Sequence, residues 1–224
     1  MKSAWAAAAI GASLILAACG GGGGDGYDGP DAPPSIITHI LSDPTADGDI
    51  EETGPDSYTV TQGMSADVQT VLAGIDPVSQ TEFRAFLNFP LTGPDGVPGN
   101  ARIESAYLEI FIDDVQPLGG RIPLLIDLVE FQPPELIGSD FDRCALPALQ
   151  SVRTSGTVSS SDAGRYLAID VTPLMIDTQH SQQSDLQLRI LVDLGPPTDT
   201  LISIDDTTGP GRSSHAPLLT VTYY

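Results

Sequence analysis

Several side chains in this sequence could bind a metal ion or transfer a proton, and their spacing decides between those chemistries. Six carboxylates gather in one short stretch: Asp43, Asp47, Asp49, Glu51, Glu52 and Asp56. Calcium takes six to eight oxygen ligands, and an EF-hand supplies them at alternating positions that do not continue past Asp47 and Asp49 here. We therefore interpret the stretch as a solvated loop, with calcium as the alternative. Asp205 and Asp206 are interpreted in the same way.

The histidines and serines form no catalytic arrangement that the sequence identifies. His39, His180 and His215 are far apart, and none has a second histidine at a metal-binding spacing. Ser213 and Ser214 directly precede His215, but a catalytic triad needs a third group that orients the base in space. A GxSxG motif is absent. We predict no catalytic residues, no metal ligands and no cofactor, and keep a hydrolase as a remote alternative.

One cysteine near the N-terminus lies in a distinctive context. Residues 1–18 contain a lysine near their start, then an apolar run, and then small side chains, which is the layout of a secretory signal. Four residues decide the kind of signal: Leu16, Ala17, Ala18 and Cys19. They resemble the lipobox of bacterial lipoproteins. The resemblance implies that diacylglycerol is attached to the Cys19 thiol, that the chain is cut before it, and that acyl chains such as palmitate hold the protein in membrane lipid. A plain secretory signal is the alternative.

The residues after Cys19 indicate a tether, here taken as 19–35. They are rich in Gly, Pro and Asp and have almost nothing to bury, so ordering them would cost more entropy than it returns. Position 20 is Gly, whereas enterobacterial lipoproteins retained at the inner membrane commonly have Asp there; by that resemblance we expect the outer membrane of the cell envelope. Lipidation would leave Cys144 unpaired, and we expect this thiol to be buried like a small apolar residue or otherwise silent, with a reactive thiol as the alternative.

Charge excludes some classes of partner. The chain has 9 Lys and Arg against 30 Asp and Glu, a formal net charge of −21. Binding to a phosphate backbone needs clustered basic side chains, so nucleic acid is excluded as a partner. Attachment to anionic lipid by charge is excluded for the same reason.

The remaining residues, 36–224, predict one all-β domain. Short apolar alternations are separated by Pro, Gly and Asp clusters. About ten strands are expected: 36–41, 58–61, 68–73, 83–89, 102–112, 123–131, 166–171, 186–192, 201–205 and 217–223. Such strands predict a two-sheet antiparallel sandwich. Thr172 before Pro173 predicts one short helix near 173–178, with the threonine hydroxyl as its N-cap.

Alternation within the strands predicts which side chains face the core. Side chains two residues apart share a face of a strand. The expected core rows are 83, 85, 87 and 89; 106, 108, 110 and 112; 186, 188, 190 and 192; and 219, 221 and 223. On the opposite parity lie three rings that we predict as a candidate ligand platform, with padding against a second layer as the alternative: Phe86, Tyr107 and Phe111.

Four segments, FRAFLNFPL, GNARIESAYLEIFI, YLAIDVTPLM and APLLTVTYY, resemble in order the landmarks of DNRLRE-type, disaggregatase-related β-sandwich domains over residues 56–224. That family implies a jelly-roll-like, carbohydrate-binding-module-like domain of bacterial surface and secreted proteins. We therefore expect a lipid-anchored envelope protein with a non-catalytic binding module for polysaccharide. A structural envelope lipoprotein that docks a protein partner is the alternative.

Overall fold

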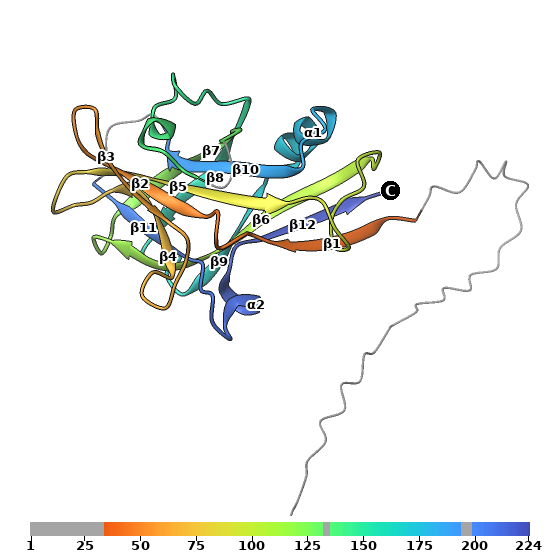
Figure 1. Cartoon of the computed structure of the whole chain (residues 1–224). Coiled ribbons are helices and arrows are strands. Elements are labelled where there is room, and N and C mark those ends of the chain that lie inside the picture. The colour runs from red at the N-terminus through yellow and green to blue at the C-terminus, as the bar shows by residue number, and fades with distance from the viewer. Residues whose placement is uncertain (1–33, 132–134, 194–198) are drawn as a thin grey trace, which may run out of the picture. The chain divides into compact units, whose positions relative to one another are not determined.

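The computed structural model describes residues 34–131, 135–193 and 199–224 (Figure 1). The predicted lipobox and lipidation residues, Leu16, Ala17, Ala18 and Cys19, lie outside this part of the chain. Pro34–Tyr224 forms a compact unit with its own core. Within it lie twelve strands: β1 (Ile36–Leu41), β2 (Gly48–Gly54), β3 (Ser57–Gln62), β4 (Thr70–Ile75), β5 (Glu82–Pro90), β6 (Ile103–Gln116), β7 (Arg121–Leu128), β8 (Gln150–Ser159), β9 (Arg165–Asp170), β10 (Asp185–Val192), β11 (Leu201–Asp205) and β12 (Leu218–Tyr223).

All pairing between these strands is antiparallel, which confirms the all-β prediction. The hydrogen-bonded order is β1-β12-β6-β11-β4-β5-β10-β7-β8, with β2 beside β5, β3 beside β2 and β9 beside β6. The two expected layers are thus joined through β4 and β5 into one continuous sheet. Strands from both ends of this order share one core, so the sheet curls over on itself. The jelly-roll connectivity stays a prediction.

The main core follows the predicted alternation. Ala85, Leu87 and Phe89 of β5 are buried, as are the inward rows of β6, β10 and β12 apart from the half-buried Val192. Phe83, at the start of the β5 row, is half-buried. Because one face of each strand covers the same interior, a register slip of one residue would expose the whole row.

Two strands were not expected, β2 and β8. The acidic stretch that we interpreted as a solvated loop contains β2; Asp49 lies in this strand, Asp47 directly precedes it, and both are buried. Its side chains are too polar to show an apolar alternation, and pairing with β3 and β5 makes it a strand. β8 is an edge strand with mostly exposed polar side chains, which explains why its sequence shows no strand signal.

A second, smaller core lies on the outer face of β5. Phe86 is fully buried there, with Ile50, Phe131 and Phe141 around it, and its ring meets that of Phe131 edge-on at 5.9 Å between centroids. The prediction that Phe86 belongs to an exposed platform is therefore wrong. The segment after β7 folds back over this face of the sheet, which is the second layer that the padding alternative required.

Three short helices complete the described residues: α1 (Thr172–His180), α2 (Arg212–His215) and the 3-10 turn η1 (Gly138–Phe141). α1 begins at the predicted Thr-Pro pair and is longer than expected. Its N-cap is Val171, without a side-chain cap, and the hydroxyl of Thr172 accepts a hydrogen bond from the Ala106 N–H of β6 at 2.9 Å instead. Among the described residues, no helix has the length and apolar character to cross a membrane.

Candidate functional site

An aromatic strip lies on the outer face of β6 and β9. We define it as Tyr107 and Phe111 of β6, Tyr166 of β9 and the imidazole of His215 in α2. Tyr107 is 43% exposed and Tyr166 54%, whereas Phe111 is half-buried between its neighbours. The ring of Phe111 lies 5.2 Å from that of Tyr166, in an edge-on arrangement, and 4.4 Å from that of His215.

Strand register explains why these rings gather. Tyr107 and Phe111 have the outward parity of β6, since Ala106, Leu108 and Ile110 fill the core. Antiparallel pairing then sets Tyr166 directly opposite Phe111, a position where cross-strand side chains touch. Tyr107 and Phe111 were predicted to share a face, and the structure places them so. Their role as a ligand platform stays a prediction.

Tyr166 and His215 were missed by sequence reasoning. For Tyr166 a signal was available, because it alternates with the inward-facing Leu167 and Ile169 and therefore had to face outward. The position of His215 had no local signal. It depends on α2, whose Arg212 forms an ion pair with the buried Asp206 at 2.9 Å and so holds the helix against the sheet.

Carboxylates border the strip. Glu109 lies on β6 between Tyr107 and Phe111, and Asp170 is the cross-strand partner of Tyr107. The Oδ2 atom of Asp205 lies 3.6 Å from Nδ1 of His215. Partial burial, and then the charges of Glu109 and Asp205, raise the pKa of the Tyr166 phenol, so its hydroxyl stays a neutral donor.

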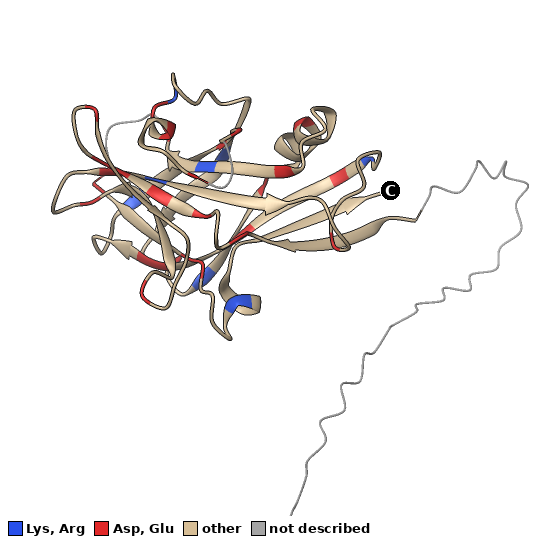
Figure 2. Cartoon of the chain, in the orientation of Figure 1, with Lys and Arg blue, Asp and Glu red and all other residues tan. Residues whose placement is uncertain are grey.

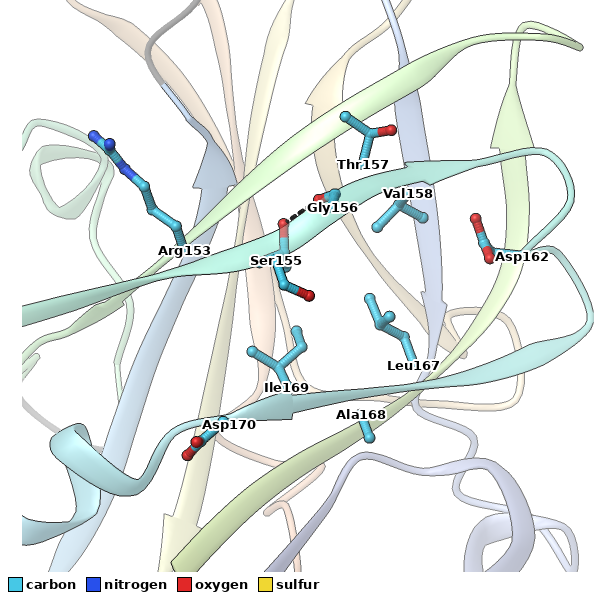
Figure 3. A pocket seen from close by; sticks show the side chains of 11 residues that line it. Arg153, Ser155, Gly156, Thr157, Val158, Asp162, Leu167, Ala168, Ile169 and Asp170 are labelled. Carbon is cyan, nitrogen blue, oxygen red and sulfur yellow. Dashed lines mark hydrogen bonds between the residues drawn. The ribbon is translucent and has the colours of Figure 1, made fainter.

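A cleft of about 240 Å³ adjoins the strip between β8 and β9 (Figure 3). These strands are consecutive in the sequence, but each pairs with a different neighbour, β8 with β7 and β9 with β6, so they diverge from their connecting turn. Apolar, hydroxyl-bearing and charged side chains all line the cleft. The apolar ones are Val158, Leu167 and Ile169, the hydroxyls belong to Thr154, Ser155 and Thr157, and the charged ones are Arg153, Asp162 and Asp170. Asp170 belongs to the border of both the strip and the cleft.

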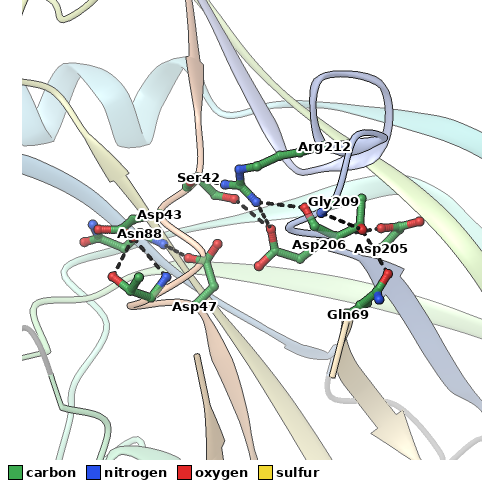
Figure 4. A network of polar contacts seen from close by, with 11 residues as sticks. Ser42, Asp43, Asp47, Gln69, Asn88, Asp205, Asp206, Gly209 and Arg212 are labelled. Carbon is green, nitrogen blue, oxygen red and sulfur yellow. Dashed lines mark hydrogen bonds and ion pairs between the residues drawn. The ribbon is translucent and has the colours of Figure 1, made fainter. Parts of the chain in front are cut away.

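A buried polar network lies where the β1–β2 loop meets the end of β11 (Figure 4). Asp47 accepts a hydrogen bond from the backbone N–H of Asn88 at 2.7 Å, and Asp206 accepts one from the Ser42 hydroxyl at 3.4 Å. Arg212 also donates to the carbonyl oxygen of Ser42. Both carboxylates are fully buried, and neither Oδ2 atom has a hydrogen-bond partner among the described residues.

Burial controls the charge of these acids. It raises the pKa of Asp47 well above the ordinary value, and the neighbouring charge of Asp206 adds to the rise. Burial likewise raises the pKa of Asp206, while Arg212 opposes the rise. Asp49, whose Oδ2 accepts the Leu72 N–H at 3.1 Å, has its pKa raised to about 7, chiefly by burial. In the described ranges, no group of three or more His, Cys, Asp or Glu side chains is placed to hold a metal ion.

The remaining candidates for chemistry are dispersed. His39 of β1 contacts the Thr220 hydroxyl at 3.1 Å, and His180 ends α1. His215 has Asp205 beside it, but Ser213 and Ser214 have no hydrogen bond to its imidazole in any described contact.

The expectation that Cys144 is buried is wrong. Its side chain is exposed, in the irregular segment between η1 and β8. The cause is local, because the backbone N–H of Cys144 bonds to the Asp142 carboxylate at 2.8 Å and shapes a surface turn that no strand covers.

In a comparison with known proteins, no family model matches the sequence, and no curated protein matches it.

Proposed function

We propose that this protein is a lipid-anchored component of the bacterial cell envelope whose domain binds polysaccharide and catalyses no reaction. The observation that supports this most directly is the aromatic strip. Two exposed tyrosine rings, Tyr107 and Tyr166, lie on adjacent paired strands with Phe111 between them.

The chemistry of the strip suits a sugar. The faces of pyranose rings carry C–H groups that pack on aromatic faces, and each ring offers a large rigid contact at low entropic cost. Phenol and carboxylate groups at the border supply donors and acceptors for sugar hydroxyls. Because β6 and β9 are paired over six residues, the rings are held on a rigid support before any ligand arrives, which lowers the cost of binding.

The cleft between β8 and β9 extends this surface. Its apolar floor and hydroxyl-bearing wall would accept a further part of an extended chain that crosses β9 from the strip. Asp170 connects the two parts, since it lines the cleft and lies opposite Tyr107. A polymer with repeating units can occupy both parts, whereas a small metabolite would need only one.

Affinity electrophoresis and a glycan array on residues 34–224, with and without calcium, test the proposal. The wild-type domain is expected to be retained by at least one polysaccharide. The double variant Tyr107→Ala and Tyr166→Ala should lose that retention, because stacking of one ring contributes on the order of 1 kcal/mol. Tyr224→Ala is the matched control, since this exposed tyrosine lies at the C-terminus, outside the strip. A wild-type domain that no glycan retains would refute sugar binding.

The membrane anchor needs a separate test. The lipobox-like residues Leu16, Ala17, Ala18 and Cys19 support acylation of the Cys19 thiol, and Gly rather than Asp at position 20 supports an outer-membrane location. Labelling cells with radioactive palmitate should mark the wild-type protein and leave a Cys19→Ala variant unlabelled. Cys144→Ala controls for acylation of the other thiol. Equal labelling of wild type and Cys19→Ala would show that the anchor is not at this cysteine.

A further inference from the structure

The border of the aromatic strip is acidic on three sides. Glu109 projects between the two β6 rings, Asp170 lies across from Tyr107, and Asp205 lies beside His215. Partial burial, and after it the charges of Glu109 and Asp205, raise the pKa of the Tyr166 phenol. A ligand on these rings would therefore lie within the field of several carboxylates.

Compensating cations are scarce around the strip. Within the described ranges, no Lys or Arg nitrogen lies within 4.0 Å of the carboxylates of Glu109 or Asp170, and His215 is the only cation-forming partner of Asp205. The nearest arginine along β9, Arg165, has the parity of Leu167 and Ile169 rather than that of Tyr166. Figure 2 shows few basic positions in the folded domain, in keeping with the net charge of −21.

From this arrangement we propose that the strip selects glycans that carry no acidic groups, and that it prefers glycans with free, protonated amino groups. This inference rests on the proposed function, because it names the class of polysaccharide that the same surface takes. Glu109 is the residue that carries most of the preference, since it lies between the rings on which a sugar would stack.

Electrostatics supports the preference in both directions. An ammonium group on a stacked sugar would donate charge-assisted hydrogen bonds to the Glu109 carboxylate. A uronate or sulfate in the same place would face the Glu109 carboxylate, which has no Lys or Arg nitrogen within 4.0 Å among the described residues, and the net charge of the domain would slow its approach. For exposed pairs each such contact changes affinity by about two- to five-fold, and salt screens it over about 10 Å at 0.1 M.

Oligosaccharides of one length and linkage provide a matched test. A β-linked N-acetylglucosamine oligomer is neutral, its deacetylated form is cationic in slightly acidic buffer, and an oligo-uronate is anionic. Binding of each to residues 34–224 is measured by calorimetry at low and high salt. We expect the deacetylated oligomer to bind about two- to five-fold more tightly than the acetylated one at low salt. Salt should reduce this ratio, and the uronate should bind most weakly.

Two variants separate the strip from the overall charge. Glu109→Gln should abolish most of the preference for the deacetylated oligomer over the acetylated one, because it removes the carboxylate that would face the ammonium group. Asp56→Asn removes one charge from the β2–β3 turn, where asparagine tolerates the positive φ, and should leave the preference intact. Equal binding of the neutral and cationic oligomers, a uronate that binds as tightly as either, or equal effects of the two variants would overturn the inference and leave sugar binding standing. Failure of every glycan on the array would instead refute the proposed function, and this inference with it.

Discussion

Asp49 should make this protein less stable at neutral pH than at mildly acidic pH. Its carboxyl is buried in β2, and burial raises its pKa from 3.8 to about 7. In the unfolded chain Asp49 ionises near 3.9, whereas in the folded protein it holds its proton until the pH approaches 7. Folding therefore gains stability from the protonated acid below the unfolded pKa and loses it as the pH rises through the folded one. The buried Asp47, whose pKa is also raised, acts in the same direction.

The size of the effect follows from the two pKa values. One pKa unit corresponds to about 1.36 kcal/mol, so the full loss for Asp49 is at most about 4 kcal/mol. Of this, about 2.5 kcal/mol falls between pH 5 and pH 8. Asp49→Asn keeps an oxygen acceptor for the Leu72 N–H and removes the titration. The variant should be more stable than wild type at pH 8, and the gap should narrow toward pH 5.

Urea unfolding of residues 34–224, followed by far-UV circular dichroism at several pH values, measures this dependence. Asp67→Asn is the control, because Asp67 is exposed and its removal should leave the pH dependence unchanged. The reasoning fails if Asp49→Asn and wild type have the same unfolding free energy at pH 8, or if their difference grows as the pH is lowered.

Three further predictions concern packing and surface chemistry. Arg189→Met should lower the unfolding free energy by about 3–5 kcal/mol. The substitution removes the guanidinium that lies 2.8 Å from the buried Asp127 carboxylate, and among the described residues it leaves Arg143 as the one remaining cation partner of that carboxylate. A loss below about 1 kcal/mol, measured by urea unfolding, would contradict this. Phe86→Ala should cost about 3–5 kcal/mol through the cavity it leaves, seen as a lower Tm, and an unchanged Tm would mean that the second core is not formed. Cys144 should react with a thiol reagent in the native protein as fast as in urea, since it is exposed; strong protection would show that it is covered.

The core could be predicted from the sequence because alternation is a local property. In β5, β6, β10 and β12 every second residue is apolar, and a strand that buries one face shows this pattern wherever its partners lie. The same logic placed Tyr107 and Phe111 on one outward face. It misplaced Phe86, because parity says which side of a strand a residue takes but not whether a second layer covers that side. The cover comes from Phe131 and Phe141, which the sequence does not connect to β5.

The two polar strands could not be predicted from their local sequence, for a related reason. β2 and β8 have few apolar residues, so their strand geometry comes from hydrogen bonds to neighbours rather than from their own alternation. Asp47 and Asp49 looked like loop residues, since aspartate is rarely buried without a partner. Their burial depends on N–H donors at Asn88 and Leu72, which lie more than twenty residues away in the chain.

By itself the sequence determined the class of fold and the side of each apolar strand that faces the interior, whereas the division into leader, tether and one domain stays a prediction. Composition and period-two alternation carry that information within a few residues. Only the tertiary structure decided which rings remain exposed, that Tyr166 and His215 join Phe111, and that β8 and β9 diverge to leave a cleft. Those features depend on contacts between segments distant in the chain, which form only when the sheet has curled around its core.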